Sequence, residues 1–229
     1  MAEQRDAGGK DRVAAARTAR SGTIRRRFAD AGLAYPPREM FLRAFKREME
    51  LELWARDNDE PFRKVATFNV TAASGGSGPK RREGDGQVPE GCYKIDVFNP
   101  QSSFHLSLGL NYPNESDRIL SDRERPGGEI FIHGGAASIG CLPLGDPAIQ
   151  ELYLVALDTR RRGQQAIHVH IFPARMTGET WSAFAKAESD GKPELRAFWA
   201  NLQRVFDAFE ETKRFPNIGI GRDGSYLVK

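Results

Sequence analysis

The sequence predicts a mainly β, α+β protein: a mixed β-sandwich with an N-terminal helix and a C-terminal helical appendage. Two patterns support this class. Between residues 51 and 172, short apolar runs alternate with polar residues, and turns rich in Gly, Pro, Asn and Asp separate them. After residue 179 the period changes, because Trp, Phe, Leu and Val recur at the three- and four-residue spacing of one helix face.

The first third of the chain contains two predicted helices and a predicted hairpin. A short helix is expected over residues 23–31. A second is expected over residues 40–48, because Phe41, Leu42 and Phe45 share one helical face after two prolines. Alternation then predicts strands over 51–55 and 65–70, joined by a polar turn.

A long Gly-rich loop over residues 74–86 separates this hairpin from the central strands. It lacks the Gly-Lys-Ser/Thr ending of a phosphate-binding loop, and such long loops are often functional. Its basic residues Lys80, Arg81 and Arg82 are interpreted as solvated.

The remaining elements are predicted from the spacing of apolar residues and from the turn and capping residues between them. Further strands are predicted over residues 91–98, 103–108, 129–132 and 166–172, with a charged loop over 116–128. Asp146-Pro147 is typical of an N-cap followed by a first-turn proline, and predicts a helix that ends at Arg161 or Arg162. Two C-terminal helices, broken near residues 191–193, and a small Asp-Gly hairpin over 216–228 complete the chain.

Composition excludes several classes of protein. The chain has 229 residues, of which 39% are hydrophobic and 28% charged, and no run approaches the roughly 18 apolar residues of a membrane span. Residues 1–22 contain no apolar signal-peptide core, so the protein is expected either to be cytosolic or to have its export segment outside the numbered chain.

Positive charge is concentrated at the N-terminus. Eight Lys/Arg and four acidic residues lie within residues 1–30, which leaves 26 basic and 27 acidic residues in the rest of the chain. The body therefore has no basic field that indicates nucleic acid as a partner. Residues 1–34 are predicted to be a basic, flexible segment.

The strongest functional signal lies in residues 129–146. An apolar strand ends on His133, a loop of small residues follows, and Gly140-Cys141 precedes the predicted helix. Such a loop can bring a histidine within hydrogen-bond reach of a thiol, and the histidine can then activate the thiol as a nucleophile. A buried, inert cysteine is an equally weighted interpretation. Cys92, at the start of a predicted strand, is interpreted as a packing residue.

These residues resemble a known family. His133-Gly134 followed by Ser138-x-Gly140-Cys141 is similar to the active-site signature of YkuD-type L,D-transpeptidase catalytic domains, and especially to their YafK-like branch. Ile139 stands where most members have a second histidine, and the His-to-Cys gap is short; both departures are usual in that branch. The likeness covers roughly residues 35–215. Further similar segments are residues 47–54, 78–85, 89–91, 99–107, 112–114, 117–118 and 169–173.

The resemblance implies a cysteine acyl-transfer enzyme that remodels the cell wall. Cys141 would be the nucleophile and His133 the proton acceptor and donor. The Gly134 carbonyl would orient the imidazole, and the Gly140 N–H would belong to an oxyanion hole. A helix that starts near Asp146 would help to lower the thiol pKa if the thiol lies close enough to its N-terminus.

The resemblance also implies the substrate and the domain plan. The substrate would be a peptidoglycan stem peptide containing meso-diaminopimelate, and no cofactor or metal would be needed. The protein would act in the cell envelope or periplasm. The catalytic domain would span residues 35–173, with its core at about 50–173, and residues 174–229 would form a C-terminal helical extension with a short hairpin.

Four other residues are candidates for substrate binding: His105, Tyr112, Arg118 and Ser138. His105 is equally well explained by a structural hydrogen bond, and Arg118 by a surface ion pair. His168 and His170 share one strand face, but no acidic or thiol partner stands beside them in the sequence. A core or cleft role is therefore favoured over a metal site.

Two functional alternatives stay open at the level of sequence. One is hydrolysis at the same site, by an amidase or carboxypeptidase that could also release a wall-attached lipoprotein. The other is a peptidoglycan-binding protein without catalysis.

Overall fold

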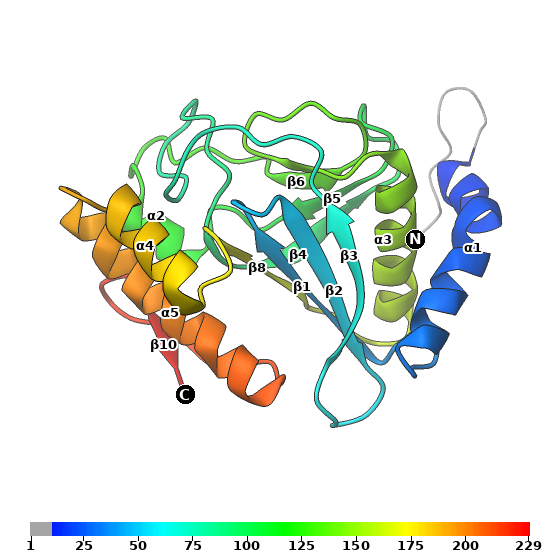
Figure 1. Cartoon of the computed structure of the whole chain (residues 1–229). Coiled ribbons are helices and arrows are strands. Elements are labelled where there is room, and N and C mark those ends of the chain that lie inside the picture. The colour runs from blue at the N-terminus through cyan, green and yellow to red at the C-terminus, as the bar shows by residue number, and fades with distance from the viewer. Residues whose placement is uncertain (1–10) are drawn as a thin grey trace.

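Eight strands form one curled, mixed sheet in the computed structural model, which describes residues 11–229 (Figure 1). The strand order is β3-β2-β1-β8-β4-β5-β6-β7; the β1–β8 and β6–β7 pairs are parallel and the other pairs antiparallel. The strands are β1 Glu39–Phe45, β2 Glu50–Arg56, β3 Arg63–Asn69, β4 Gly91–Asn99, β5 Ser107–Leu110, β6 Phe131–His133, β7 Leu142–Pro143 and β8 Ile167–Phe172.

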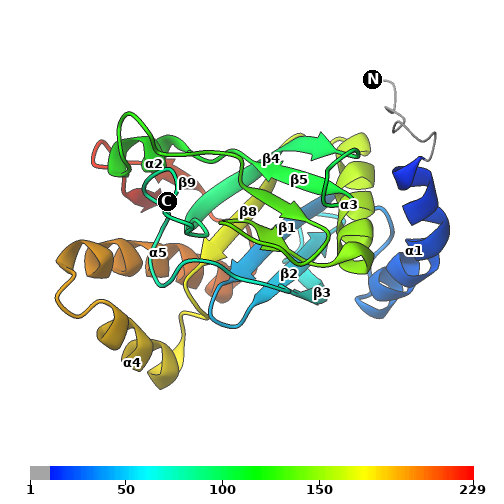
Figure 2. The same ribbon diagram turned by 90° about the horizontal axis from the view of Figure 1, so that it is seen from above.

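Helices flank the sheet on two sides (Figures 1 and 2). Helices α1 and α3 lie together on one side, and α4, α5 and the separate hairpin of β9 and β10 lie on the other. The helices are α1 Arg12–Asp30, α2 Glu115–Leu120, α3 Asp146–Arg161, α4 Gly178–Glu188 and α5 Pro193–Thr212; the hairpin strands are β9 Ile218–Ile220 and β10 Tyr226–Val228. The predicted fold class is confirmed, as are α3, both C-terminal helices and the hairpin.

Strand β1 corrects the helix predicted over residues 40–48. It pairs with both β2 and β8, and both of its faces are buried. Met40 and Leu42 enter the core shared with α3, whereas Phe41 and Phe45 pack toward the C-terminal elements. The sequence of a strand buried on both faces is a continuous apolar run, and periodicity alone does not distinguish such a run from a helix.

Helix α1 corrects the predicted flexible N-terminal segment wherever the structure describes it; residues 1–10 of that prediction lie outside the described residues. The Asp11 side chain caps the helix by accepting the backbone N–H groups of Val13 and Ala14 at 2.9 and 3.0 Å. Arg17 makes an ion pair with Asp158 on α3 at 2.7 Å. The buried side chains of α1 are Val13, Ala16, Ile24 and Phe28.

The segment predicted as a charged loop over 116–128 begins with the short helix α2. A capping box forms it, because Asn114 accepts the Asp117 backbone N–H and Asp117 accepts that of Asn114. Two strands are also shifted from their predicted positions: β5 begins at Ser107 and β6 at Phe131. The prediction missed α2 because its apolar positions are too few to show a period.

The C-terminal helices pack on the face of the sheet that presents Phe45 and Phe172. The Trp199 indole N–H donates to buried Glu90 at 2.7 Å, and Glu90 also makes an ion pair with Lys46 at 2.8 Å. This arrangement confirms the interpretation of the C-terminal Trp/Phe stripe as a packing face. Among residues 11–229, no helix has the length and apolarity required to cross a lipid bilayer.

Candidate active site

The loop of residues 134–141 joins β6 to β7 and brings Cys141 beside the strand that ends in His133. Ile132 pairs with Leu142 in a parallel register, and both are buried in the core. Successive side chains along a strand point to opposite faces. Cys141 and His133 therefore both lie on the face opposite to that of Ile132 and Leu142. The structure therefore places the predicted base at the end of β6 and the predicted nucleophile immediately before β7, on one face.

The Cys141 thiol is half-buried and has two hydrogen-bond contacts. The Phe131 backbone N–H donates to Sγ at 3.4 Å, and the thiol itself points to the Glu129 carbonyl oxygen at 3.7 Å. Burial raises the pKa of Cys141, and the Phe131 N–H opposes this shift. Because burial is the largest cause and the net shift is upward, the resting residue is a neutral thiol. The expected contribution of the following helix to the thiol pKa stays a prediction.

The His133 ring is held in one orientation. Its Nδ1 lies 2.5 Å from the Gly134 carbonyl oxygen, and the Phe104 ring covers it at 4.7 Å between centroids. Because a carbonyl oxygen only accepts, Nδ1 carries the proton and Nε2 has a free lone pair. Burial lowers the pKa of His133, so the imidazole is neutral at pH 7. Gly134 thus makes the contact expected of it.

Both ends of the 134–141 loop are tied down. The Gly135 N–H donates to Asp146 Oδ1 at 2.9 Å, and the Ser138 hydroxyl donates to the Cys141 carbonyl at 2.8 Å. Gly145, rather than Asp146, is the N-cap of α3, so the Asp146 carboxylate holds the loop instead of the helix. Ser138, predicted to bind substrate, here shapes the turn that carries the thiol.

Gly140 has a partner that the sequence did not reveal. Its N–H, predicted to belong to an oxyanion hole, donates to Ser74 Oγ at 2.6 Å. Ser74 in turn donates to the Gly86 carbonyl at 2.8 Å, so this hydroxyl joins the Gly-rich loop to the loop of the thiol. The Gly140 N–H is therefore engaged in this state; the unusual length of the Gly-rich loop was the only signal of such a role.

A cavity of about 540 Å³ is lined by Glu129, whose carbonyl oxygen the Cys141 thiol contacts, although neither Cys141 nor His133 lines it. Its walls come from residues 80–86 and 124–130, and Ile139, with 85% of its surface exposed, lies at its edge. Lys80 was interpreted as solvated but is buried in this wall, where it binds Asp85 at 2.7 Å. The ion pair with Asp85 compensates for burial of the Lys80 ammonium group. The positive charge of Lys80 acts to lower the Cys141 pKa.

The other predicted substrate residues have structural partners or lie elsewhere. His105 Nε2 lies 2.9 Å from the amide nitrogen of Gln150 on α3. The buried Tyr112 hydroxyl donates to the Pro126 carbonyl at 3.0 Å and so braces one cavity wall. Arg118 is exposed on α2, while its neighbour Asp117 pairs with Arg81 at 3.2 Å. None of these three lines the 540 Å³ cavity next to Glu129.

Sequence reasoning also missed Arg12, which ties α1 to the loop that covers His133. Its guanidinium donates to the carbonyl oxygens of Ser102 and His105, both at 2.7 Å. Between these two residues lies Phe104, whose ring covers the imidazole. The N-terminal helix is thus connected by side-chain hydrogen bonds to the candidate active site.

The His168 and His170 pair behaves as the sequence predicts. His170 is fully buried, with Phe41 packed against it at 4.7 Å between ring centroids, and neither of its nitrogens has a hydrogen-bond partner in the described structure. Across residues 11–229, no three His, Cys, Asp or Glu side chains are grouped closely enough to hold a metal ion.

Replacing Gly134 by alanine is expected to destabilise the protein by about 1–3 kcal/mol, the usual cost of overpacking. The new Cβ would lie 2.6 Å from both Asp146 Oδ1 and the Phe104 carbonyl oxygen. Chemical denaturation of the wild type and variant measures the change. Gly76→Ala is the matched control, because a Cβ there meets nothing within 4 Å. Equal stability of the two variants would contradict the described packing around Gly134.

The pH profile of kcat/KM should have its acidic limb below pH 6.5. The lowered pKa of His133 keeps the base form present to lower pH than in a free imidazole, and activity is lost as pH falls through that pKa. The raised pKa of Cys141 should keep the thiol form present to above pH 9. Initial rates across pH 4–10 test this, and an acidic midpoint near 7.5 would contradict the lowered pKa of His133.

Comparison with known proteins assigns the family. The profile of the L,D-transpeptidase catalytic domain (YkuD) matches residues 45–169, more than half of the chain. Proteins named "Putative L,D-transpeptidase YafK" from Escherichia coli K12 and O157:H7 are 28% identical over 191 residues, which cover 82% of this chain and 73% of theirs.

Solved structures with similarity to the chain include the helical cell shape determining protein Pgp2 from Campylobacter jejuni and Bd1075 from Bdellovibrio bacteriovorus. Pgp2 has a TM-score of 0.48 and 15% identity, covering 80% of this chain and 73% of its own. Bd1075 has a TM-score of 0.43 and 15% identity, covering 83% and 77%. The family profile includes β6, the 134–141 loop and β7, with both His133 and Cys141. The chain therefore belongs to the L,D-transpeptidase catalytic domain (YkuD) family.

Proposed function

We propose that this protein is a cysteine acyltransferase that acts on peptidoglycan stem peptides, with Cys141 as nucleophile and His133 as general base. The observation that carries the proposal is the pairing of β6 with β7, which puts a half-buried thiol and an oriented, neutral imidazole on one face. The thiol contacts Glu129, which lines the 540 Å³ cavity. Membership of the L,D-transpeptidase family supports the substrate class.

The first half-reaction forms a thioester. The Cys141 proton moves from its resting contact with the Glu129 carbonyl to Nε2 of His133, and sulfur attacks the carbonyl carbon at the L-centre of meso-diaminopimelate. Collapse of the tetrahedral intermediate breaks the C–N bond to the terminal D-Ala or another attached amine. The imidazolium gives its proton to that departing amine.

The second half-reaction reverses these proton transfers. An acceptor amine attacks the thioester carbonyl and loses a proton to His133, and the C–S bond breaks to regenerate the thiol. The Gly134 carbonyl keeps Nδ1 protonated throughout, so Nε2 faces the reacting atoms in both steps. Positive charge on Lys80 favours the negative charge that develops near sulfur. Water in place of the amine would give hydrolysis on the same residues.

Purified protein incubated with tetrapeptide muropeptides, with and without an acceptor amine, tests the proposal by mass spectrometry of the products. Transfer predicts loss of D-Ala together with amine-dependent exchanged or cross-linked products. Trimmed stems alone, unchanged by the amine, would assign hydrolysis. Unmodified stems in both arms, with wild-type protein that still labels at Cys141, would reject the proposed substrate.

A further inference from the structure

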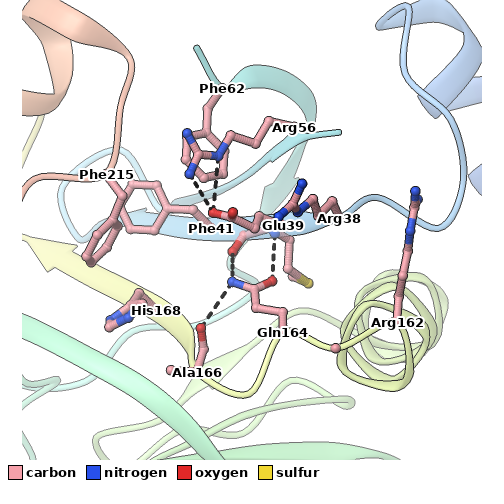
Figure 3. Close-up of a pocket in the computed structure, with 12 residues that line it drawn as sticks. Arg38, Glu39, Phe41, Arg56, Phe62, Arg162, Gln164, Ala166, His168 and Phe215 are labelled. Carbon is pink, nitrogen blue, oxygen red and sulfur yellow. Dashed lines mark hydrogen bonds and ion pairs between the residues drawn. The ribbon is translucent and has the colours of Figure 1, made fainter. Parts of the chain in front are cut away.

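A second cavity, of about 590 Å³, lies away from the candidate active site (Figure 3). It is formed where β1 and β8 begin, at the end of α3, and beside the segments that carry Phe62 and Phe215. Three strands, β4, β5 and β6, separate β8 from β7, the strand that follows Cys141. Its volume lies in the range of small-molecule sites.

The lining is unequally charged, because it holds three guanidinium groups and one carboxylate. Arg56 donates to Glu39 through Nη2 at 2.8 Å and Nε at 3.1 Å, which neutralises that pair. Arg162 Nη1 donates to the Pro36 carbonyl oxygen and lies 3.6 Å from Asp57 Oδ1. Arg38 is exposed, and no ion pair joins it to any carboxylate in the described part of the chain. Among the described residues, an anion entering this cavity would therefore meet the Arg38 guanidinium, which has no ion pair, and the Arg162 guanidinium, of which only Nη1 is engaged, by Pro36 and Asp57.

Aromatic rings form the other side of the cavity. The half-buried rings of Phe215 and His168 lie 4.2 Å apart between centroids, and Phe41 meets Phe215 edge-on at 5.4 Å. Phe62 lies beneath the Arg56 guanidinium at 4.8 Å. Burial, together with the charge of Lys94, lowers the pKa of His168, so this ring is a neutral aromatic surface at pH 7. A flat ring can pack here without bringing a second charge.

The floor of the cavity is held by Gln164, whose amide is fully engaged. Oε1 accepts the Met40 N–H at 2.8 Å, and Nε2 donates to the carbonyl oxygens of Met40 and Ala166 at 2.9 and 3.0 Å. These bonds join the beginnings of β1 and β8, as the dashed lines in Figure 3 show. The cavity is thus preformed, which lowers the entropic cost of binding.

We propose that this cavity is a binding site for a small organic anion that carries a planar ring. The anionic group binds Arg38 and Arg162 at the solvent side, and the ring packs against Phe215 and His168. Guanidinium groups favour phosphate or carboxylate through paired hydrogen bonds, and the aromatic wall adds apolar contact area. The site is independent of acyl transfer at Cys141.

Titration calorimetry with three probes tests the site in the full chain: phenyl phosphate, inorganic phosphate and phenol. Phenyl phosphate should bind at one site per chain, about tenfold or more tighter than either probe that lacks the ring or the charge. Arg38→Gln should weaken phenyl phosphate about fivefold or more. The matched control is Arg125→Gln, which removes the same charge at the 540 Å³ cavity next to Glu129 and should leave phenyl phosphate affinity unchanged.

Phe215→Leu separates the two parts of the site. It should remove the preference for phenyl phosphate over phosphate while phosphate affinity stays the same, and Cys141→Ala should bind phenyl phosphate as the wild type does. Equal weakening by Arg38→Gln and Arg125→Gln would indicate only general electrostatic attraction and overturn the proposal. Failure of phenyl phosphate to bind more tightly than phosphate, or to saturate at one site, would also overturn it.

Discussion

Cys141→Ala should lose acyl transfer by roughly 10⁴-fold or more, because the thioester cannot form without the sulfur. The fold should persist, since Cys141 is half-buried and its neighbour Leu142 supplies the core contacts. The measurement is the rate of D-Ala release from tetrapeptide muropeptides, together with the unfolding temperature of each protein.

Cys92→Ala is the matched control for Cys141→Ala, because it removes the only other cysteine. Cys92 packs against the C-terminal cluster, and burial raises its pKa well above the usual value. We expect iodoacetamide to label the wild type at Cys141 and not at Cys92, and Cys92→Ala to retain activity. D-Ala release that survives in Cys141→Ala, or that disappears equally in both variants, would contradict the proposed nucleophile.

His133→Gln should lower kcat by about 10²–10⁴-fold, the range attributed to a general base. Glutamine keeps a polar group at a buried position, yet it cannot take the thiol proton. The variant should also lose the acidic limb of the pH profile, because that limb reports the titration of His133. Initial rates across the pH range measure both effects.

His105→Gln is the control for His133→Gln, since His105 lies in the same region but contacts Gln150 on α3. Its expected loss is below about tenfold, and its acidic limb should stay in place because His133 still titrates. If His133→Gln kept the wild-type pH profile, or if His105→Gln removed the limb, the assignment of the base to His133 would fail.

The elements best predicted from sequence are those with a clear one-sided period. Helix α5 has one apolar stripe, and this stripe is a packing face in the structure. Helix α3, which is buried over the consecutive residues 151–156, was predicted instead from the Asp146-Pro147 pair at its start. Strand β1 was misassigned because both of its faces are buried. Helix α1 was underestimated because only a few of its residues are buried, and its ion pairs with α3 leave no local signal in the sequence.

The candidate site also has residues that the sequence predicted and residues that it did not. His133 and Cys141 could be predicted because the small residues between them allow the chain to fold back tightly, which brings the histidine near the thiol. The contacts of Ser74, Phe104 and Arg12 come from distant segments and have no signature near the loop.

The sequence alone determined the chemical groups of the site and their order along the chain: a histidine at the end of a strand, a glycine-rich return and a thiol. Tertiary structure decided their electrostatic state. Burial raises the pKa of the thiol and lowers that of the imidazole, so both groups are neutral at pH 7. Tertiary structure also brings Ser74 to the Gly140 N–H, which donates a hydrogen bond to its hydroxyl oxygen. The reason is physical, because pKa values and free donors depend on solvent and on partners brought from far along the chain, which a local pattern does not contain.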